Sequence, residues 1–407
     1  MRSATATGGR GWVNSTVLGI VLATFLSDAG HEMATAILPL YLAGLGLGPA
    51  ALGLIEGAAD LAGSLSRLAG GVSGHYLRSK RPLAALGYLL TAVVTGALAL
   101  AQTLPMLVTF RAGAWAARGF RGPLRDFLLA DAVPASHFAR AYGLERAGDM
   151  LGAVTGPLLA AVCLSFSVSH ASILVWSVLP GVAAAAAMWF LTRERLAPEA
   201  ATESTHTRAP RDAPRAKLPR AFWILLVGVL LFGMGDFSRS FLILLAAQAF
   251  GNDVAQPGAV SLAVLLFAGH NLISALAAYP VGALADRVGR RRPLIAGYAL
   301  GAGTHLLLAI ASASPVGVIG AIALSGVYVA IEETLEKSMV AEILPRELRS
   351  LGLGILATAN AIGDLVSSVL VGLLLQAGRP DLGFGLCAGL ALAGAVWLAA
   401  TRPRIST

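Results

Sequence analysis

The sequence predicts an all-α membrane protein of twelve transmembrane helices, arranged as two pseudo-symmetric six-helix bundles. The chain of 407 residues is 56% hydrophobic and 13% charged, whereas soluble domains carry about 25% charged residues. Apolar stretches of about 20 residues, the length needed to span a bilayer, recur along the whole chain. The second half also repeats spaced features of the first half.

Twelve apolar segments qualify as spanning helices. Six lie in the first half, at 15–42, 52–75, 83–103, 105–129, 138–165 and 170–192. Six lie in the second half, at 221–249, 257–284, 292–312, 315–341, 350–376 and 382–401. Residues 194–219 are charged and rich in Pro, Ala and Thr without apolar periodicity, which is typical of a flexible linker. We therefore expect a bundle over 1–193, a linker over 194–219 and a bundle over 220–407.

The two halves behave as repeats. A constant shift of 211 residues aligns Gly71 with Gly282 and the pair Arg81-Pro82 with Arg292-Pro293. The same shift aligns Pro134 with Pro345, Gly143 with Gly354, Gly152 with Gly363, Asp60 with Asn271 and Asp149 with Asn360. Duplicated halves are the build of many secondary transporters, whose sites lie between the halves near mid-membrane.

Basic residues in the connections predict the orientation. One set of connections holds Arg78, Lys80, Arg81, Arg140, Arg193, Arg195, Arg287, Arg290, Arg291, Arg292, Arg346 and Arg349, and the opposite set holds only Arg379. Because basic loops stay on the cytoplasmic side, we expect both termini to be cytoplasmic. The first apolar run lacks a cleavage pattern and is interpreted as a retained span.

Several function classes are disfavoured. The net charge of +8 is not gathered in a soluble basic domain, so no nucleic-acid partner is expected. The sequence contains no phosphate loop, no His or Cys cluster with metal-ligand spacing and no Ser-His-Asp motif. We therefore expect neither an enzyme nor a cofactor or metal. Cys163 and Cys387 are interpreted as small core residues.

Charged residues inside the apolar helices indicate a polar interior. Burying such a charge costs roughly 2.5–3.5 kcal/mol on insertion scales, so it persists when paired or when it lines a wet pathway. The densest stretch is 111–157, which holds Arg111, Arg118, Arg121, Arg125, Asp126, Glu145, Arg146 and Asp149. This stretch predicts the wall of a transport pathway.

Two carboxylate pairs are candidates for proton coupling. Asp28 and Glu32 are four residues apart and share one face of the first helix, with His31 beside them. Glu145 and Asp149 repeat this spacing on the fifth helix. A carboxyl group in a low-dielectric site can load and release protons near neutral pH. The alternative is that these carboxylates pair with arginines for structure alone.

Further charged residues are candidates for the substrate cavity. Arg111, Arg118 and Arg125 are seven residues apart on one face of the fourth helix, and Arg118 or Arg121 could bind an anionic group bidentately. In the second half, Glu332 and Glu333 could bind a cationic group. The full set expected in the cavity is His31, Arg111, Arg118, Arg121, Asp236, Glu332 and Glu333. Pairing between helices is the alternative role for the carboxylates.

The loop after the second span of each half carries a family resemblance. The segment GALADRVGRRRP, from Gly282 to Pro293, resembles the loop motif of the major facilitator superfamily. The first-half copy, GVSGHYLRSKRP, has His75 where the motif has Asp. The resemblance implies a gating contact that holds the cytoplasmic side closed. Its expected members are Gly71, His75, Arg81, Arg125, Asp126, Gly282, Asp286, Arg287 and Arg290.

The fifth span resembles the antiporter motif of proton-driven exporters in that superfamily. Its glycines are Gly143, Gly152 and Gly156, followed by Pro157, and it departs from the motif at Ala160 and Ala161. The segments FLSDAGHEM, GLIEG and RGFRGPLRD resemble a prokaryotic drug and metabolite exporter-like branch.

The resemblance implies proton-coupled transport of a small solute by alternating access, with H+ antiport and efflux expected. It further implies a monomer in the bacterial cytoplasmic (inner) membrane, with lipid, protons and solute as its partners. Proton symport of a small metabolite is one alternative. A non-coupled membrane sensor or scramblase on the same fold is another.

Overall fold

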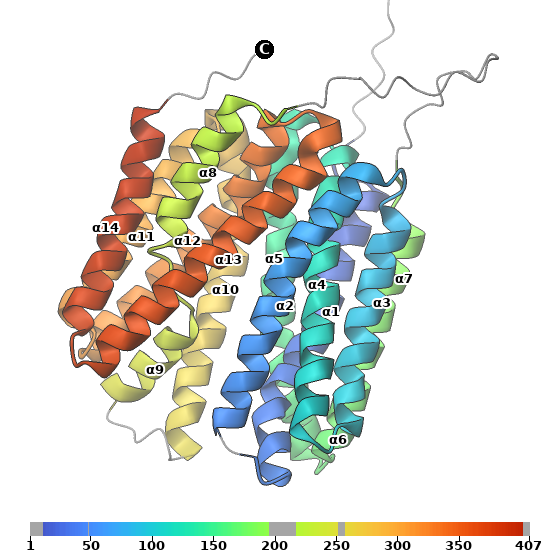
Figure 1. The fold of residues 1–407 in the computed structure, drawn as a ribbon, viewed down its shortest axis with the longest axis vertical. Helices are drawn as coiled ribbons and strands as arrows, with labels where there is room; N and C mark the ends of the chain where they lie inside the picture. The colour runs from blue at the N-terminus through green and yellow to red at the C-terminus, as the bar shows by residue number, and fades with distance from the viewer. Residues whose placement is uncertain (1–10, 48, 195–216, 251–256, 402–407) are drawn as a thin grey trace, which may run out of the picture.

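A computed structural model describes residues 11–47, 49–194, 217–250 and 257–401, and Figure 1 shows their arrangement. The N-bundle consists of α1 (Ser15–Gly44), α2 (Pro49–Tyr76), α3 (Arg81–Ala97), α4 (Leu104–Ala132), α5 (Phe138–Ser165), α6 (His170–Trp176) and α7 (Val178–Leu191). The C-bundle consists of α8 (Arg220–Gly233), α9 (Ser240–Ala249), α10 (Pro257–Val288), α11 (Arg291–Ala311), α12 (Pro315–Ile343), α13 (Arg346–Gln376) and α14 (Pro380–Ala400). Most of the predicted linker, and the ends of the chain, lie outside the described residues.

Nine helical segments in the described part of the chain are long and apolar enough to cross a membrane. The segments α2 and α4 are of similar length but fall outside this group, because charged residues lower their hydropathy. On α4 these include Arg111, Arg118, Arg121, Arg125, Asp126 and Asp131. The low hydropathy of α2 and α4 therefore comes from the charged residues that were predicted to form the polar interior.

Two predicted spans are interrupted. The span 170–192 breaks into α6 and α7 at Ser177, because Pro180 cannot donate the helical hydrogen bond to the carbonyl of Trp176. The span 221–249 breaks into α8 and α9 around residues 234–239, a stretch with Gly235 and other weak helix formers. There Ser367 Oγ donates a hydrogen bond to the backbone carbonyl of Asp236 (2.8 Å), so the broken helix still has a partner for a freed backbone group.

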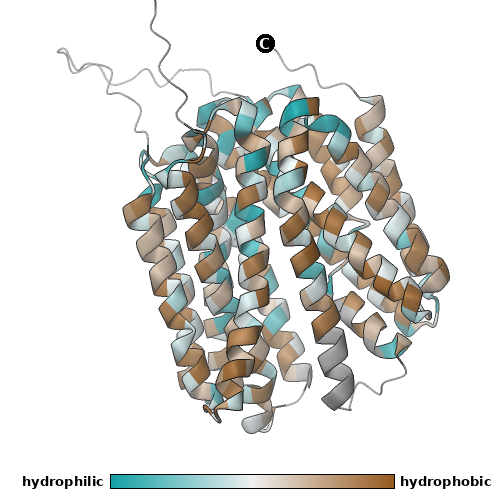
Figure 2. Cartoon of the chain, turned by 180° about the vertical axis from the view of Figure 1, so that it is seen from behind, coloured by the Kyte–Doolittle hydropathy of each residue, from teal (hydrophilic) through white to brown (hydrophobic). Residues whose placement is uncertain are grey.

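The outer surface of the helices is apolar. Large side chains such as Phe166, Phe190, Ile310 and Val316 are almost 80% exposed. Figure 2 shows brown, hydrophobic residues along the helices and teal, hydrophilic residues gathered at the end where α1 begins and α14 ends. A helical protein with such a surface is built to contact lipid, because helices satisfy their own backbone groups.

We call the end where α1 begins and α14 ends the basic end, because it holds the connections with Arg78, Lys80, Arg290 and Arg346. At this end, the segment after α7 contacts the start of α3 within the N-bundle. The carboxylate of Glu194, just after α7, accepts hydrogen bonds from the backbone N–H groups of Lys80 (2.8 Å) and Arg81 (3.0 Å) and from Ser79 Oγ (2.8 Å). Glu194 thereby satisfies free donors at the start of α3.

The bundles meet along two seams at the basic end. In the α2–α13 seam, a Cβ added to Gly71 would lie 2.8 Å from Gly354 Cα. In the α5–α10 seam, a Cβ added to Gly282 would lie 2.2 Å from the Ala139 carbonyl oxygen, and one added to Gly143 would lie 2.4 Å from that of Ala278. Glycine is required at these points because backbone meets backbone. The seams are related by the predicted 211-residue repeat, since Gly71 corresponds to Gly282 and Gly143 to Gly354.

Candidate functional site

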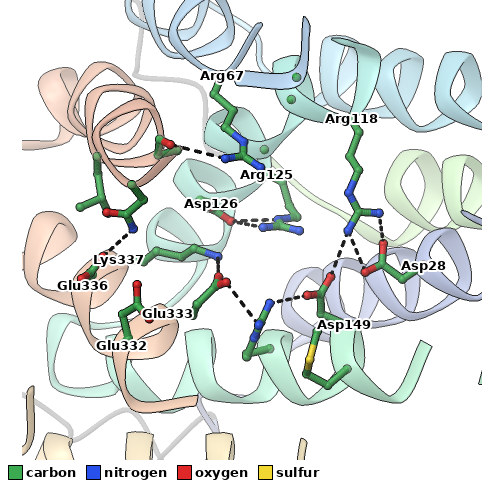
Figure 3. A pocket seen from close by; sticks show the side chains of 18 of the residues that line it. Asp28, Arg67, Arg118, Arg125, Asp126, Asp149, Glu332, Glu333, Glu336 and Lys337 are labelled. Atoms are coloured by element: carbon green, nitrogen blue, oxygen red, sulfur yellow. Dashed lines mark hydrogen bonds and ion pairs between the residues drawn. The ribbon is translucent and has the colours of Figure 1, made fainter. Parts of the chain in front are cut away.

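A cavity of about 360 Å³ lies between the bundles (Figure 3). Its N-bundle wall contains Asp28, Glu32, Arg67, Trp115, Arg118, Arg121, Arg125, Asp126, Arg146 and Asp149. Its C-bundle wall contains Asp236, Arg239, Asn271, Glu332, Glu333, Glu336, Lys337, Asn360 and Asp364. The sequence-predicted groups Asp28, Glu32, Asp149, Arg118, Arg121, Asp236, Glu332 and Glu333 therefore face one space.

Arg118 links three helices of the N-bundle. Its guanidinium on α4 forms a bidentate pair with Asp28 on α1, with Nη2 lying 2.9 Å from Asp28 Oδ2. The same nitrogen lies 3.8 Å from Asp149 Oδ1 on α5. Figure 3 shows Arg118 between the two carboxylates. Arg118 therefore joins α4 to α1 through Asp28 and lies within reach of Asp149 on α5.

A second network lies toward the basic end. Arg125 on α4 pairs with its neighbour Asp126 (2.7 Å) and with Glu145 on α5 (2.7 Å). Glu145 lies behind the cavity lining, whereas Arg125 and Asp126 belong to it. The predicted proton-coupling carboxylates thus have different surroundings, because Glu145 is held in a buried ion pair and Glu32 borders the cavity.

Arg111 and His31 lie outside the cavity lining, deeper in the N-bundle. Arg111 is fully buried and binds Glu56 with Nε (3.1 Å) and Nη2 (3.2 Å), while Nη2 also donates to Thr35 Oγ1 (3.1 Å). His31 packs edge-on against Trp115, with ring centroids 5.2 Å apart. In this conformation both contribute to the support of the wall, and Trp115 stands between His31 and the solute space.

The C-bundle wall is dominated by carboxylates. Glu336 is satisfied on both oxygens, by Tyr298 Oη and by Asn360 Nδ2 (2.7 Å). Asp236 accepts a hydrogen bond from Tyr328 Oη (2.7 Å), which in turn lies 3.3 Å from His305 Nε2. Sequence reasoning passed over Asn360 and Asn271 as site residues, although their alignment with Asp149 and Asp60 in the repeat was a signal for them.

One ion-pair cluster crosses from bundle to bundle within the cavity. Arg146 on α5 binds Asp149 (2.7 Å) and reaches Glu333 on α12 (3.2 Å). Glu333 also interacts with Arg239 (3.6 Å) and Lys337 (3.5 Å). Both oxygens of Glu333 are thus engaged by cations in this conformation.

The predicted gating residues gather at the basic end. Asp286 on α10 accepts hydrogen bonds from the backbone N–H groups of Ala139 (3.1 Å) and Arg140 (3.0 Å), at the start of α5. Arg290 binds Asp286 (3.0 Å) and donates to the Ala135 carbonyl. His75 Nδ1 lies 2.8 Å from the Glu347 carbonyl oxygen of α13. Arg81 stays within the N-bundle, where Nη1 donates to the Thr192 carbonyl (3.4 Å).

The glycines of the predicted antiporter motif make close helix contacts. A Cβ on Gly152 would lie 2.5 Å from the Phe25 carbonyl oxygen, and one on Gly156 would lie 2.5 Å from that of Ala29. Both contacts join α5 to α1 beside Asp28, and Pro157 follows within α5. Gly143 differs because it packs against α10 of the other bundle.

The comparison with known families decides the identity of the fold. The family model of the Major Facilitator Superfamily matches residues 20–269 and 236–407. The chain belongs to the Major Facilitator Superfamily. It is therefore a multi-pass membrane protein that transports a small solute, and not an enzyme.

Individual members of the superfamily resemble the whole chain. An uncharacterized MFS-type transporter of Methanocaldococcus jannaschii is 24% identical over 352 residues, which cover 86% of each chain. The Escherichia coli fucose:proton symporter matches with a TM-score of 0.73 at 15% identity, over 94% of this chain and 98% of that one. The human organic anion transporter MFSD10 matches with a TM-score of 0.72 at 16% identity, over 94% and 99%. At these identities the solved structures establish the shared fold.

Proposed function

We propose that the protein is a proton-coupled secondary active transporter that exports a small solute by H+ antiport. It works as a monomer with twelve crossings, in which α6 with α7 and α8 with α9 each form one crossing. It lies in the cytoplasmic membrane of a prokaryote with both termini and the basic end in the cytoplasm. The positions of basic residues in the connections support this orientation.

The Arg118 cluster is the observation that carries the proposal. Asp28 lines the solute cavity and is held by Arg118, which also reaches Asp149. A proton on Asp28 removes the charge that Arg118 binds, so the guanidinium becomes free to turn toward Asp149 or toward an anionic group. Proton binding, solute binding and the packing of α1 against α4 and α5 are thereby linked through one side chain.

The seams support alternating access. Contacts between the bundles gather at the basic end, on α2, α5, α10 and α13, while the cavity lies between the bundles. With the basic end in the cytoplasm, this conformation is closed to the cytoplasm. Proton entry can supply the free energy for solute export, because a membrane potential of 100 mV is worth about 2.3 kcal/mol per charge.

The test is solute-driven proton flux in proteoliposomes with a pH dye trapped inside. A panel of organic cations, anions, sugars and amino acids is added in turn to the wild type, Asp28→Asn and Glu32→Gln. Asp381→Asn is the matched control, because this carboxylate pairs with Arg379 in an exposed connection away from the cavity. We expect a solute to evoke proton movement that Asp28→Asn abolishes and Asp381→Asn leaves unchanged.

The direction of flux separates export from import. Solute moving against the proton flow supports antiport. Solute moving with the proton flow indicates symport, which is the mode of the fucose:proton symporter. Transport that is indifferent to the pH gradient and to both variants would contradict proton coupling and favour a non-coupled role.

A further inference from the structure

Each wall of the cavity has a charged side chain without an ion-pair partner among the described residues, a cation on one wall and a carboxylate on the other. Most of their charges are already used, since Arg118 is bound to Asp28 and Glu333 is bound to Arg146. In the described part of the chain, six lining residues have buried polar atoms without a hydrogen-bond partner. Trp115 and Asn360 are uncharged, and Arg146 and Arg239 already bind Glu333. Two charged groups without an ion pair remain among the six. They are Arg121 on the N-bundle wall and Glu332 on the C-bundle wall.

Arg121 is a cation with spare donors. It is 3% exposed, its Nη2 donates to Ser27 Oγ (2.9 Å), and its guanidinium carbon lies 3.6 Å from the centre of the Tyr88 ring. Its Nε and Nη1 atoms have no hydrogen-bond partner among the described residues. The indole Nε1 of Trp115, on the same helix and in the same wall, also lacks one there. Leaving such donors buried and unpaired is costly.

Glu332 is the counterpart on the opposite wall. It is 5% exposed, and its Oε2 atom has no hydrogen-bond partner in the described part of the chain. Its neighbour Glu336 differs, because Tyr298 and Asn360 occupy both of its oxygens. In the same wall, Arg239 Nε is also unpaired within the described ranges, but its guanidinium already interacts with Glu333. Among the described residues of this wall, Glu332 is therefore the carboxylate with a buried, unpaired oxygen, and Figure 3 shows it on the wall opposite Arg118.

We propose that the solute is bipolar, carrying an anionic group and a protonated amine on one small molecule. Arg121, with the Trp115 indole, binds the anionic group, and Glu332 binds the amine. This proposal rests on the proposed function, in that it takes the cavity to be the solute site. The cavity volume of about 360 Å³ is in the range of small-molecule sites, and each charge is met by a charge-assisted hydrogen bond.

Matched triads of compounds test the proposal by binding to the purified protein. One triad is 6-aminohexanoate, hexanoate and hexylamine, and another is phenylalanine, 3-phenylpropionate and 2-phenylethylamine. Affinities come from titrated thermal shifts without any gradient. In at least one triad we expect the bipolar member to bind at least about tenfold more tightly than either single-charge member, because each loses one charge-assisted contact.

Two variants assign the contacts. Glu332→Gln should make the amino acid bind no better than the acid, and Arg121→Gln should make it bind no better than the amine. Glu332→Asp keeps the charge and should retain the preference if Glu332→Gln yields too little protein. Arg379→Gln and Asp381→Asn, in an exposed connection, are matched controls that should leave every affinity unchanged.

The outcomes separate this proposal from the proposed function. Equal affinity within every triad, no binding by any bipolar member, or a preference that survives both Glu332→Gln and Arg121→Gln would overturn the bipolar solute. Bipolar binding without proton flux in proteoliposomes would support the site and contradict proton coupling. Coupled flux of a solute with a single charge would support coupling and overturn the bipolar solute.

Discussion

The α5–α10 seam is held by a carboxylate, whereas the α2–α13 seam has an imidazole at the equivalent position of the repeat. Asp286 accepts two backbone N–H groups at the start of α5 and binds Arg290. His75 meets α13 at the carbonyl oxygen of Glu347. Because a carbonyl oxygen only accepts, His75 Nδ1 must be the donor.

This difference teaches that related seams can be joined by opposite chemistry. A carboxylate is favoured at a helix N-terminus, where backbone donors are free and the helix dipole is positive. At the start of α13, His75 meets the carbonyl oxygen of Glu347. A donor side chain suits this contact, whereas a carboxylate placed there would face another acceptor. The sequence resemblance places His75 at the Asp position of the loop motif, where a carboxylate would be expected. The geometry instead supports a donor suited to its own seam.

The largest expected effect comes from removing Asp286. In Asp286→Ala, the N–H groups of Ala139 and Arg140 and the guanidinium of Arg290 all lose their carboxylate. Breaking a buried, hydrogen-bonded charge pair typically costs about 3–5 kcal/mol, so the basic end should open. The measurement is the distance between spin labels at Leu100 and Leu382, exposed at the opposite end, in a protein whose Cys163 and Cys387 are replaced by Ala.

The matched variant for this experiment is His75→Ala. We expect the label distance to shorten clearly in Asp286→Ala and to change little in His75→Ala. Equal changes in the two variants would break the comparison, because the seams would then be of similar strength.

A smaller effect is expected from filling the glycine contacts. A Cβ in Gly282→Ala would lie 2.2 Å from a backbone oxygen, against 2.8 Å from a Cα atom in Gly71→Ala. Overpacking of this kind costs typically 1–3 kcal/mol, about the scale expected here, and more at Gly282. The same label pair and the melting temperature measure it.

Controls for the glycine variants lie on the same helices. Gly269→Ala on α10 and Gly53→Ala on α2 place a Cβ where no described atom lies within 4 Å. They should leave both readouts unchanged. A larger loss in Gly71→Ala than in Gly282→Ala would reverse the proposed order of the seams.

The smallest effect is expected from exchanging the chemistry at His75. His75→Asp places an acceptor against the Glu347 carbonyl oxygen and should weaken the seam by about 1 kcal/mol, seen as a modest shift in label distances. His75→Asn keeps a donor and should stay close to the wild type. A stabilising His75→Asp would show that the seam prefers the carboxylate of its counterpart after all.

Much of the fold could be predicted from the sequence because the bilayer imposes a simple rule on helix length and polarity. Broken helices were harder to predict. The interruption around residues 234–239 is flanked by apolar runs on both sides, and hydropathy averaged over the whole span does not record where a helix loses its hydrogen bonds. Pro180 was a local signal for the other break.

The sequence could predict which charged residues share one face of a helix, but not which residues they pair with on other helices. The spacing of Asp28 and Glu32 placed both on one face, and both line the cavity. For Glu332 and Glu333, the sequence left open whether they bind a cationic group or pair with another helix. Within the cavity, the structure pairs Glu333 with Arg146 of the other bundle. The sequence did not specify this partner, because pairing across bundles depends on how far one bundle is tilted against the other.

The hydrogen bonds of Glu194 have a consequence for biosynthesis. The carboxylate that follows α7 returns to the start of α3, so the N-bundle completes its internal contacts before residues 195–216 begin. Since chains fold from the N-terminus as they are synthesised, the N-bundle can assemble while α8 is still inside the ribosome. We therefore expect the two halves, expressed as separate chains divided within residues 195–216, to assemble into a functional complex.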